Sequence, residues 1–151
     1  RDPPRRTVRE EIMNKIKFAD YNEGQDIPEL RVGPITQMDL VRYAGASGDF
    51  NPIHNDVEFA KSAGLPGTIA HGMYIMALMG RQVTNWAPPT QVKFFGVKFK
   101  GMSLPGETMV FTGKIKKKKE DNGEKLIMVS LTAANDKGEV KVSGDVTVKA
   151  E

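Results

Sequence analysis

Apolar and polar residues alternate along most of the second half of the chain. A spacing of two is typical of half-buried strands, and it runs through four segments: 92–99, 109–115, 127–133 and 140–148. The turn formers Asn122-Gly123 and the run 135–138 separate the last three segments, as hairpin connections do. In the first segment the alternation changes parity beside Gly96, which predicts a bulge or a strong bend there. These positions predict a curved antiparallel sheet.

Helical spacing occurs only in the first half of the chain. A short strand is expected over about 27–32, followed by a helix over 37–46 with Thr36 as its N-cap. The segment 71–86 is the most apolar helix candidate, because its first half has almost no polar face, and Pro88-Pro89 ends it. A helix that is apolar all round belongs inside a protein, wrapped by other elements.

Together these elements predict an α+β protein of the hot-dog class, with a curved antiparallel sheet wrapped around one long buried helix. A length of 151 residues suits a single domain with its own core. We expect this domain to cover 18–151, and we expect 1–17, which carries alternating charges and few apolar residues, to form an N-terminal arm or a frayed helix.

Composition excludes several classes of chemistry. The chain has no cysteine, so disulfides, cysteine-based zinc sites and thiol nucleophiles are ruled out. It also has no apolar run of the roughly 18 residues that a membrane span needs, and no signal-peptide core near Arg1. We therefore expect no membrane partner and a cytoplasmic location, or an organelle matrix if a targeting segment was removed.

The formal charge of +3 is mild, and much of the excess is in Lys114 and the run 116–119. No stacking aromatic residues lie among these lysines, and a turn signal follows them, so a solvated hairpin tip explains them better than nucleic-acid binding. We expect no nucleic-acid partner. The modest positive field can still help to attract an anionic, phosphorylated carrier.

Candidate chemistry is concentrated between the helix over 37–46 and the apolar helix. Asp49, Asn51 and His54 lie within six residues, with a glycine before them and Pro52 between them. Proline restricts its own backbone and that of the residue before it, so the turn can aim the carboxylate and the imidazole at one point. Such a pair is the minimum equipment for general acid–base catalysis near neutral pH.

Two alternatives stand beside that interpretation. Asp49 and Asn51 are common turn formers, so they can serve the turn alone while His54 packs under the loop. A metal site would need ligands from Asp49, His54, Asp56 and His71, but no tight two-histidine spacing is present. We expect no metal and no other cofactor.

Two motifs carry a resemblance to a known family. The segment Tyr43–Ala60 resembles the signature of the MaoC-like, or hydratase 2, family, and Ile69-Ala70-His71-Gly72-Met73 resembles its second block. The family comprises (R)-specific enoyl-CoA hydratases and 3-hydroxyacyl-ACP dehydratases of fatty-acid metabolism. The resemblance covers about 18–150 and includes the 22-residue step from Asp49 to His71.

The resemblance implies a function and roles for four residues. The reaction would be the reversible hydration of trans-2-enoyl thioesters, carried on CoA or acyl carrier protein, to (3R)-3-hydroxyacyl thioesters. Asp49 and His54 would form the catalytic dyad. Asn51 would bind substrate and orient the site, and the backbone N–H of Gly72 would hold the thioester carbonyl oxygen. A helix N-terminus offers free N–H donors and the positive end of the dipole for that oxygen.

Other residues of these motifs suit structural roles. We expect His71 to support the helix start and Tyr43 to pack rather than react. Gly80 stands where some of the hydratases carry a serine, which affects acyl-chain preference more than catalysis. The methionines Met76, Met79 and Met102 either line an acyl tunnel or belong to the core.

Two other functions remain open at this level. A hot-dog thioesterase would hydrolyse the thioester, yet such enzymes generally place an acidic residue on or beside the central helix, and 71–83 has none. The chain can also be a non-catalytic acyl-thioester-binding subunit of a heterodimer, although the intact set at 49–54 argues against it. In each case the small sheet leaves unprotected edges, so we expect a homodimer or a heterodimer with a related subunit.

Overall fold

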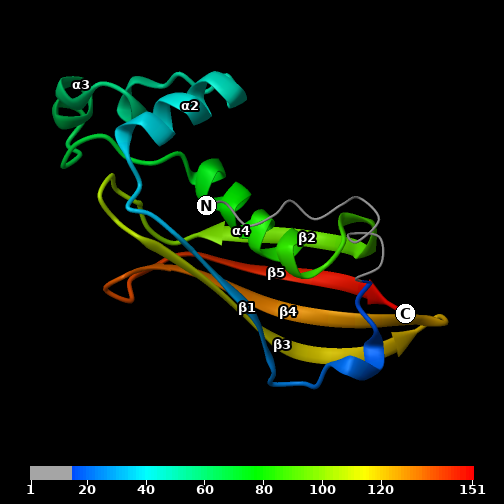
Figure 1. Ribbon diagram of the computed structural model, residues 1–151. Coiled ribbons are helices and arrows are strands. Elements are labelled where there is room, and N and C mark those ends of the chain that lie inside the picture. Colours follow the sequence, from blue (N-terminus) through cyan, green and yellow to red (C-terminus); the bar gives the residue numbers. More distant parts are fainter. Residues whose placement is uncertain (1–14) are drawn as a thin grey trace, which may run out of the picture.

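A computed structural model of the chain describes residues 15–151. Within this range one antiparallel sheet has the strand order β1-β3-β4-β5-β2. The strands are β1 (Asp26–Val32), β2 (Val92–Phe99), β3 (Met109–Asp121), β4 (Glu124–Asn135) and β5 (Val140–Ala150). Figure 1 shows that the sheet is twisted and that α4 (Gly72–Trp86) lies along one of its faces. This is the hot-dog arrangement, so the predicted fold class is confirmed.

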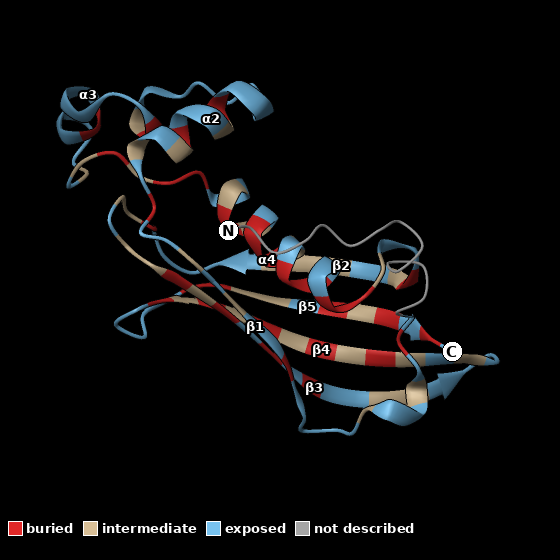
Figure 2. Cartoon of the chain, viewed as in Figure 1, coloured by how far each residue is buried: buried red, intermediate tan, exposed pale blue. Residues whose placement is uncertain are grey.

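The inward side chains of the long strands form the core. Ile127, Val129, Leu131 and Ala133 of β4 are all at most 1% exposed, in the alternating pattern that their spacing predicts. Asn122 and Gly123 both have positive φ, and they make the two-residue turn between β3 and β4. Figure 2 shows the buried positions running through the middle of the sheet under α4.

The central helix is buried on one face only, which corrects the expectation of a helix apolar and buried all round. Ile75, Met79 and Val83 face the sheet and are at most 2% exposed, whereas Met73 is 55% exposed. A five-stranded sheet covers one side of a helix, so the other side is free within the described part of a single chain. Helix and sheet approach closely at Gly144, where an added Cβ would lie 3.2 Å from the Met79 sulfur.

The bulge in β2 lies three residues before the predicted place. Val92 pairs with Val148 and Phe94 with Thr147, so the extra residue is Lys93, and the pairing is regular through Gly96. Gly96 has a different role, because the Phe94 ring lies where a Cβ at that position would be. The alternation of side chains changes at the extra residue, and the glycine accommodates the ring two positions later.

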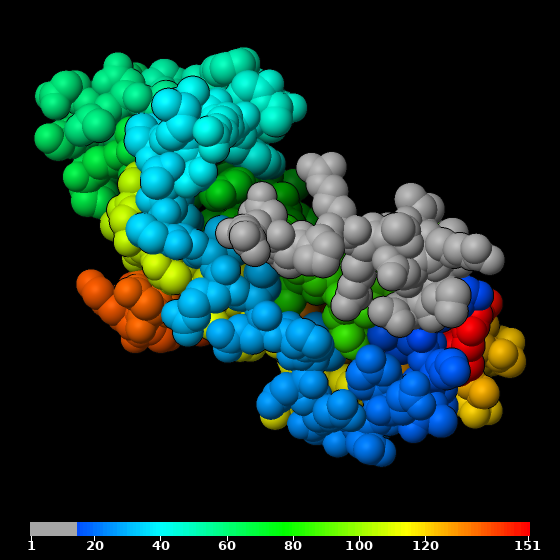
Figure 3. All heavy atoms as spheres, in the orientation of Figure 1, coloured from blue at the N-terminus to red at the C-terminus, as the bar shows by residue number. Residues whose placement is uncertain are grey.

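A small helical lobe projects from one end of the sheet. It contains α2 (Gln37–Ser47), the 3-10 turn η2 (Pro52–His54) and α3 (Val57–Ser62), which confirms the helix predicted at 37–46 and the Thr36 N-cap. In Figures 1 and 3 the lobe stands above the sheet beside the start of α4. Its few buried residues include Leu40, Ala44 and Ala60.

The two remaining 3-10 turns, η1 (Phe18–Asp20) and η3 (Pro89–Gln91), lie near the C-terminal end of α4. Ile16 is 3% exposed, and its backbone N–H and C=O both bond the side chain of Gln91. Residues from Lys15 onward thus belong to the packed domain. The predicted arm over 1–17 otherwise lies outside the described residues. None of the helices in the described part of the chain combines the length and the hydrophobicity that a membrane crossing requires.

Candidate active site

The exit of α2 places Asp49. A capping box between Thr36 and Asp39 fixes the start of this helix, and hydrogen bonding to Thr36 lowers the pKa of the Asp39 carboxyl group. At the other end Gly48 takes the left-handed conformation, φ 77°, and its N–H closes on the Ala44 carbonyl. The chain therefore leaves the helix in a sharp turn, with Asp49 as its first residue.

Hydrogen bonds within the turn fix the next five residues. The N–H of Asn51 donates to Asp49 Oδ1 at 3.2 Å, and Asn51 Oδ1 accepts from the N–H of Ile53 at 3.2 Å. Asn51 is thus the N-cap of η2, Pro52 is its first residue and His54 its last. The carboxamide oxygen of Asn51 is used in holding the turn, and its predicted contact with substrate stays a prediction.

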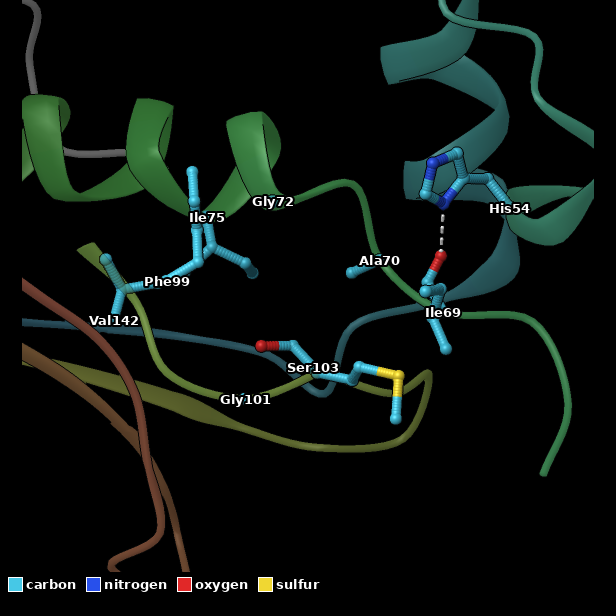
Figure 4. A pocket seen from close by; sticks show the side chains of 10 residues that line it. His54, Ile69, Ala70, Gly72, Ile75, Phe99, Gly101, Ser103 and Val142 are labelled. Carbon is cyan, nitrogen blue, oxygen red and sulfur yellow. Dashed lines mark hydrogen bonds between the residues drawn. The ribbon is translucent and has the colours of Figure 1, made fainter. Parts of the chain in front are cut away.

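His54 is held in one orientation beside Asp49. Its Nδ1 lies 2.7 Å from the carbonyl oxygen of Ile69, a bond drawn in Figure 4. Because a carbonyl only accepts, Nδ1 carries the hydrogen, and the neutral ring has its free lone pair on Nε2. That nitrogen lies 3.8 Å from Asp49 Oδ2. The ring is 7% exposed while the Asp49 side chain is half-exposed, so the pair opens toward solvent from the aspartate side.

His71 lies directly against the dyad. Its ring stacks on His54 with centroids 3.7 Å apart, and its Nε2 donates to the Asp49 carbonyl at 3.1 Å. Desolvation by burial lowers the pKa of His71, and its buried Nδ1 has no hydrogen-bond partner among residues 15–151. A charged ring would need a second acceptor, so His71 is a neutral support. The edge of Tyr43 packs on this ring at 4.9 Å, as expected for a packing residue.

The same three side chains could hold a metal ion by distance alone. Asp49, His54 and His71 each offer a ligand atom within 4.8 Å of the others. However, the two imidazole rings are stacked at an interplanar angle of 23°, and one nitrogen of each ring already donates to a backbone carbonyl. Asp56, the fourth member considered from the sequence, instead caps α3 by accepting from the N–H of Phe59. The geometry favours acid–base chemistry over metal binding.

A cavity of about 200 Å³ opens beside His54, between the start of α4 and the sheet. Most of its wall is apolar, and its lining consists of His54, Ile69, Ala70, Gly72, Ile75, Phe99, Gly101, Met102, Ser103 and Val142. Of the three methionines considered for an acyl tunnel, Met102 lines this cavity, whereas Met79 is fully buried in the core.

Gly72 brings a backbone donor to the cavity wall. It is the first residue of α4, and His71 makes no side-chain cap there, so the N–H of Gly72 has no partner within the helix. An added Cβ at this position would lie 3.0 Å from the Phe99 ring. A side chain there would therefore narrow the approach to the N–H.

Three polar residues of the site carry no signal in the sequence. Gln37 Nε2 donates to the His54 carbonyl at 2.8 Å, and Thr68 Oγ1 donates to Gln37 Oε1 at 2.6 Å. Ser103 lines the cavity. Gln37 lies 17 positions before His54, Thr68 lies 31 positions after Gln37, and Ser103 lies 49 positions after His54. Only the folded chain brings these residues to the dyad.

The neutral state of His71 predicts how stability depends on pH. In the unfolded chain its pKa returns to about 6.5, so below that pH the unfolded state binds a proton that the folded state rejects. The free energy of unfolding should thus be constant above pH 7 and fall as the pH drops from 6.5 toward the lowered folded pKa. The carboxyl groups with lowered pKa values, such as those of Asp39 and Glu107, change the free energy of unfolding only near and below pH 4.5.

Urea unfolding of the wild type and of His71→Gln at pH 7.5 and 5.5 tests this expectation. The variant should be less stable at pH 7.5, because it loses the stacked ring, but its stability should change less between the two pH values. An equal loss in both proteins would contradict a neutral His71.

Comparisons with known proteins find relatives among enzymes. Over 112 residues the chain is 36% identical to the β subunit of fatty acid synthase from Saccharomyces cerevisiae, an alignment that covers 70% of the chain and 5% of that protein. It is 35% identical to the enoyl-CoA hydratase ChsH3 of Mycobacterium tuberculosis over 54% of the chain and 30% of that protein. The chain thus spans only a small part of the curated relatives that it matches.

Solved structures agree over most of the chain. The unliganded R-hydratase PhaJ1 of Pseudomonas aeruginosa superposes with a TM-score of 0.79 at 25% identity, covering 90% of this chain and 86% of that one. The ChsH1–ChsH2 complex of Mycobacterium tuberculosis gives a TM-score of 0.74 at 25% identity over 86% and 98%. The family described as MaoC like domain matches residues 22–137. The chain belongs to the MaoC-like dehydratase family.

Proposed function

We propose that this chain catalyses the reversible hydration of trans-2-enoyl thioesters to 3-hydroxyacyl thioesters. One observation carries the proposal: His54, whose ring is oriented by Ile69 and whose Nε2 lies 3.8 Å from the Asp49 carboxylate, lines a cavity whose wall also includes the N-terminal residue of α4. The hydratases among its relatives support the same reaction.

The geometry suits a water molecule as the attacking group. A separation of 3.8 Å is too long for a direct bond between His54 and Asp49, yet one water oxygen can lie within hydrogen-bond reach of both. As that oxygen attacks C3, the dyad takes a proton from the water and delivers a proton to C2. One C–O and one C–H bond form while the C2–C3 π bond breaks, and dehydration reverses each step.

Negative charge builds on the thioester oxygen during this attack. The N–H of Gly72, at the positive end of the α4 dipole, would donate a hydrogen bond to that oxygen and stabilise its charge. The helix that carries Gly72, α4, packs on β1, β2, β4 and β5. We infer a (3R) product from membership of the family, with CoA or acyl carrier protein as the carrier.

The first prediction concerns the dyad. Asp49→Asn and His54→Ala should each lower the rate of crotonyl-CoA hydration by about 10²–10⁴-fold, because each removes one half of the proton transfer. Loss of the enone absorbance measures the rate. Asp136→Asn, on the exposed turn between β4 and β5, is the matched control and should retain the wild-type rate.

Three outcomes would contradict this proposal. Turnover at wild-type rates in both dyad variants would contradict the proposed mechanism. Release of free thiol without loss of the enone would indicate a thioesterase, and binding of enoyl-CoA without either reaction would indicate a non-catalytic acyl-binding subunit.

A second prediction concerns the backbone donor. Gly72→Ala should lower kcat/KM by about tenfold or more, because the methyl group crowds the Phe99 ring and narrows the path to the N–H. Gly80→Ala is the matched change in the same helix. A Cβ at that position lies 3.6 Å from Phe95, an ordinary contact, so activity should persist. Equal loss in both variants would point to a general effect on α4 instead.

We further propose that the chain dimerises through β2. This strand is the last in the sheet order, and its residues Phe94 and Phe99 are 56% and 52% exposed. An exposed apolar edge readily pairs with another strand, and the neighbour solved as the ChsH1–ChsH2 complex supports pairing of such domains.

Sedimentation equilibrium tests the assembly. The wild type should have about twice the monomer mass of 16.7 kDa, and Phe94→Lys should shift it toward the monomer by placing a charge on the edge. Phe59→Lys, at an apolar position on the lobe that is 46% exposed, is the control and should leave the mass unchanged. A monomeric wild type would exclude the homodimer.

A further inference from the structure

The cavity beside the dyad contains one polar group that no part of the described chain satisfies. Ser103 is 3% exposed, and its Oγ has no hydrogen-bond partner among residues 15–151. A buried hydroxyl without a partner costs free energy of folding. It is tolerated where a ligand or a bound water supplies the missing hydrogen bond.

The backbone holds this hydroxyl in place. The Ser103 carbonyl accepts from the N–H of Ala70 at 2.8 Å, in the segment that leads from Ile69 to the start of α4. In the same segment, the Ile69 carbonyl accepts from His54 Nδ1. Ser103 is thereby tied to the strip of chain that also orients the dyad.

Figure 4 shows where the hydroxyl points. The Ser103 side chain is directed into the cavity, toward Ile75 and Val142 and away from His54. In the proposed reaction the substrate's C3 lies beside His54 and its carbonyl oxygen beside Gly72. The remaining part of the cavity, toward Ile75 and Val142, would then hold the acyl tail, and the Ser103 hydroxyl is directed into that part.

The size of the cavity limits that tail. About 200 Å³ is below the 300–1,000 Å³ usual for small-molecule sites. The wall around the tail is otherwise apolar, formed by side chains such as Ile75, Phe99 and Val142. In such a surrounding, a single hydroxyl discriminates strongly between a ligand oxygen and a methyl group, because the methyl group leaves it unpaired.

We propose that Ser103 is a specificity-determining residue, whose hydroxyl hydrogen-bonds an oxygen substituent at C4 or C5 of a short acyl chain. This inference rests on the proposed hydratase function and narrows its substrate class to short, oxygenated enoyl thioesters. The reaction itself is unchanged, with water added across C2 and C3, and the hydroxyl of Ser103 takes no part in bond making.

Matched substrates test the inference. Pent-2-enoyl-CoA and 4-hydroxybut-2-enoyl-CoA differ only by a methyl group against a hydroxyl group, as do hex-2-enoyl-CoA and 5-hydroxypent-2-enoyl-CoA. The wild type should prefer the hydroxylated member of at least one pair by about tenfold in kcat/KM. Ser103→Ala should abolish the preference, whereas Ser130→Ala, a serine on β4 outside the cavity lining, should preserve it.

A second readout separates a specificity role from a structural one. Because the Ser103 hydroxyl makes no hydrogen bond within the described chain, Ser103→Ala should melt at the wild-type temperature or above. A lower melting temperature would show that a water molecule or another group satisfies the hydroxyl, and would overturn the inference.

The remaining outcomes distinguish this inference from the proposed function. If the wild type hydrates all four thioesters and Ser103→Ala keeps their ratios, the function stands and the inference fails. If the variant slows both members of each pair equally, Ser103 acts on the thioester carbonyl, and the inference also fails.

Binding covers the case of an inactive wild type. The saturated pair 4-hydroxybutanoyl-CoA and pentanoyl-CoA is then compared by calorimetry. A wild-type preference for the hydroxylated ligand that Ser103→Ala removes would support the inference while the hydratase function fails. Equal affinities in both proteins would overturn it.

Discussion

The site depends on a reciprocal contact between two segments that are distant in the sequence. The N–H of Ile69 donates to the Ile53 carbonyl at 3.1 Å, and His54 Nδ1 donates to the Ile69 carbonyl at 2.7 Å. These two bonds join the lobe of α2, η2 and α3 to the segment that begins α4. The second bond assigns the hydrogen to Nδ1 of His54 and leaves the lone pair on Nε2 free, as the proposed role of His54 as a base requires.

Burial of His71 supports the same arrangement by excluding charge. A neutral ring stacks on His54 and donates to the Asp49 carbonyl, so it fixes both members of the dyad without adding a positive charge beside them. The cost is a buried nitrogen without a partner in the described chain. A protein retains such a cost where the surrounding geometry serves function.

The cavity combines an apolar wall with few polar groups, and each polar group has a distinct position. His54 lies at one side, Gly72 at the start of the helix, and the hydroxyl of Ser103 is directed toward Ile75 and Val142. Low polarity strengthens each hydrogen bond that a ligand makes there. In the proposed reaction these three groups would orient the substrate. The half-exposed side chain of Asp49 connects the pair to solvent.

Local sequence patterns predicted most of the elements and the turn that holds Asp49 close to His54. Strands with a period of two, the Asn122-Gly123 turn and the Thr36 cap are local features, because propensity, alternation and capping act over a few residues. The proximity of Asp49 and His54 could also be predicted, because the two residues are five positions apart in a single turn that contains a proline. Tertiary structure alone decided the free face of α4, the bulge at Lys93, and the contacts of Gln37, Thr68 and Ser103. Each of these depends on which distant segments pack together, and no local pattern of apolar and polar residues encodes that.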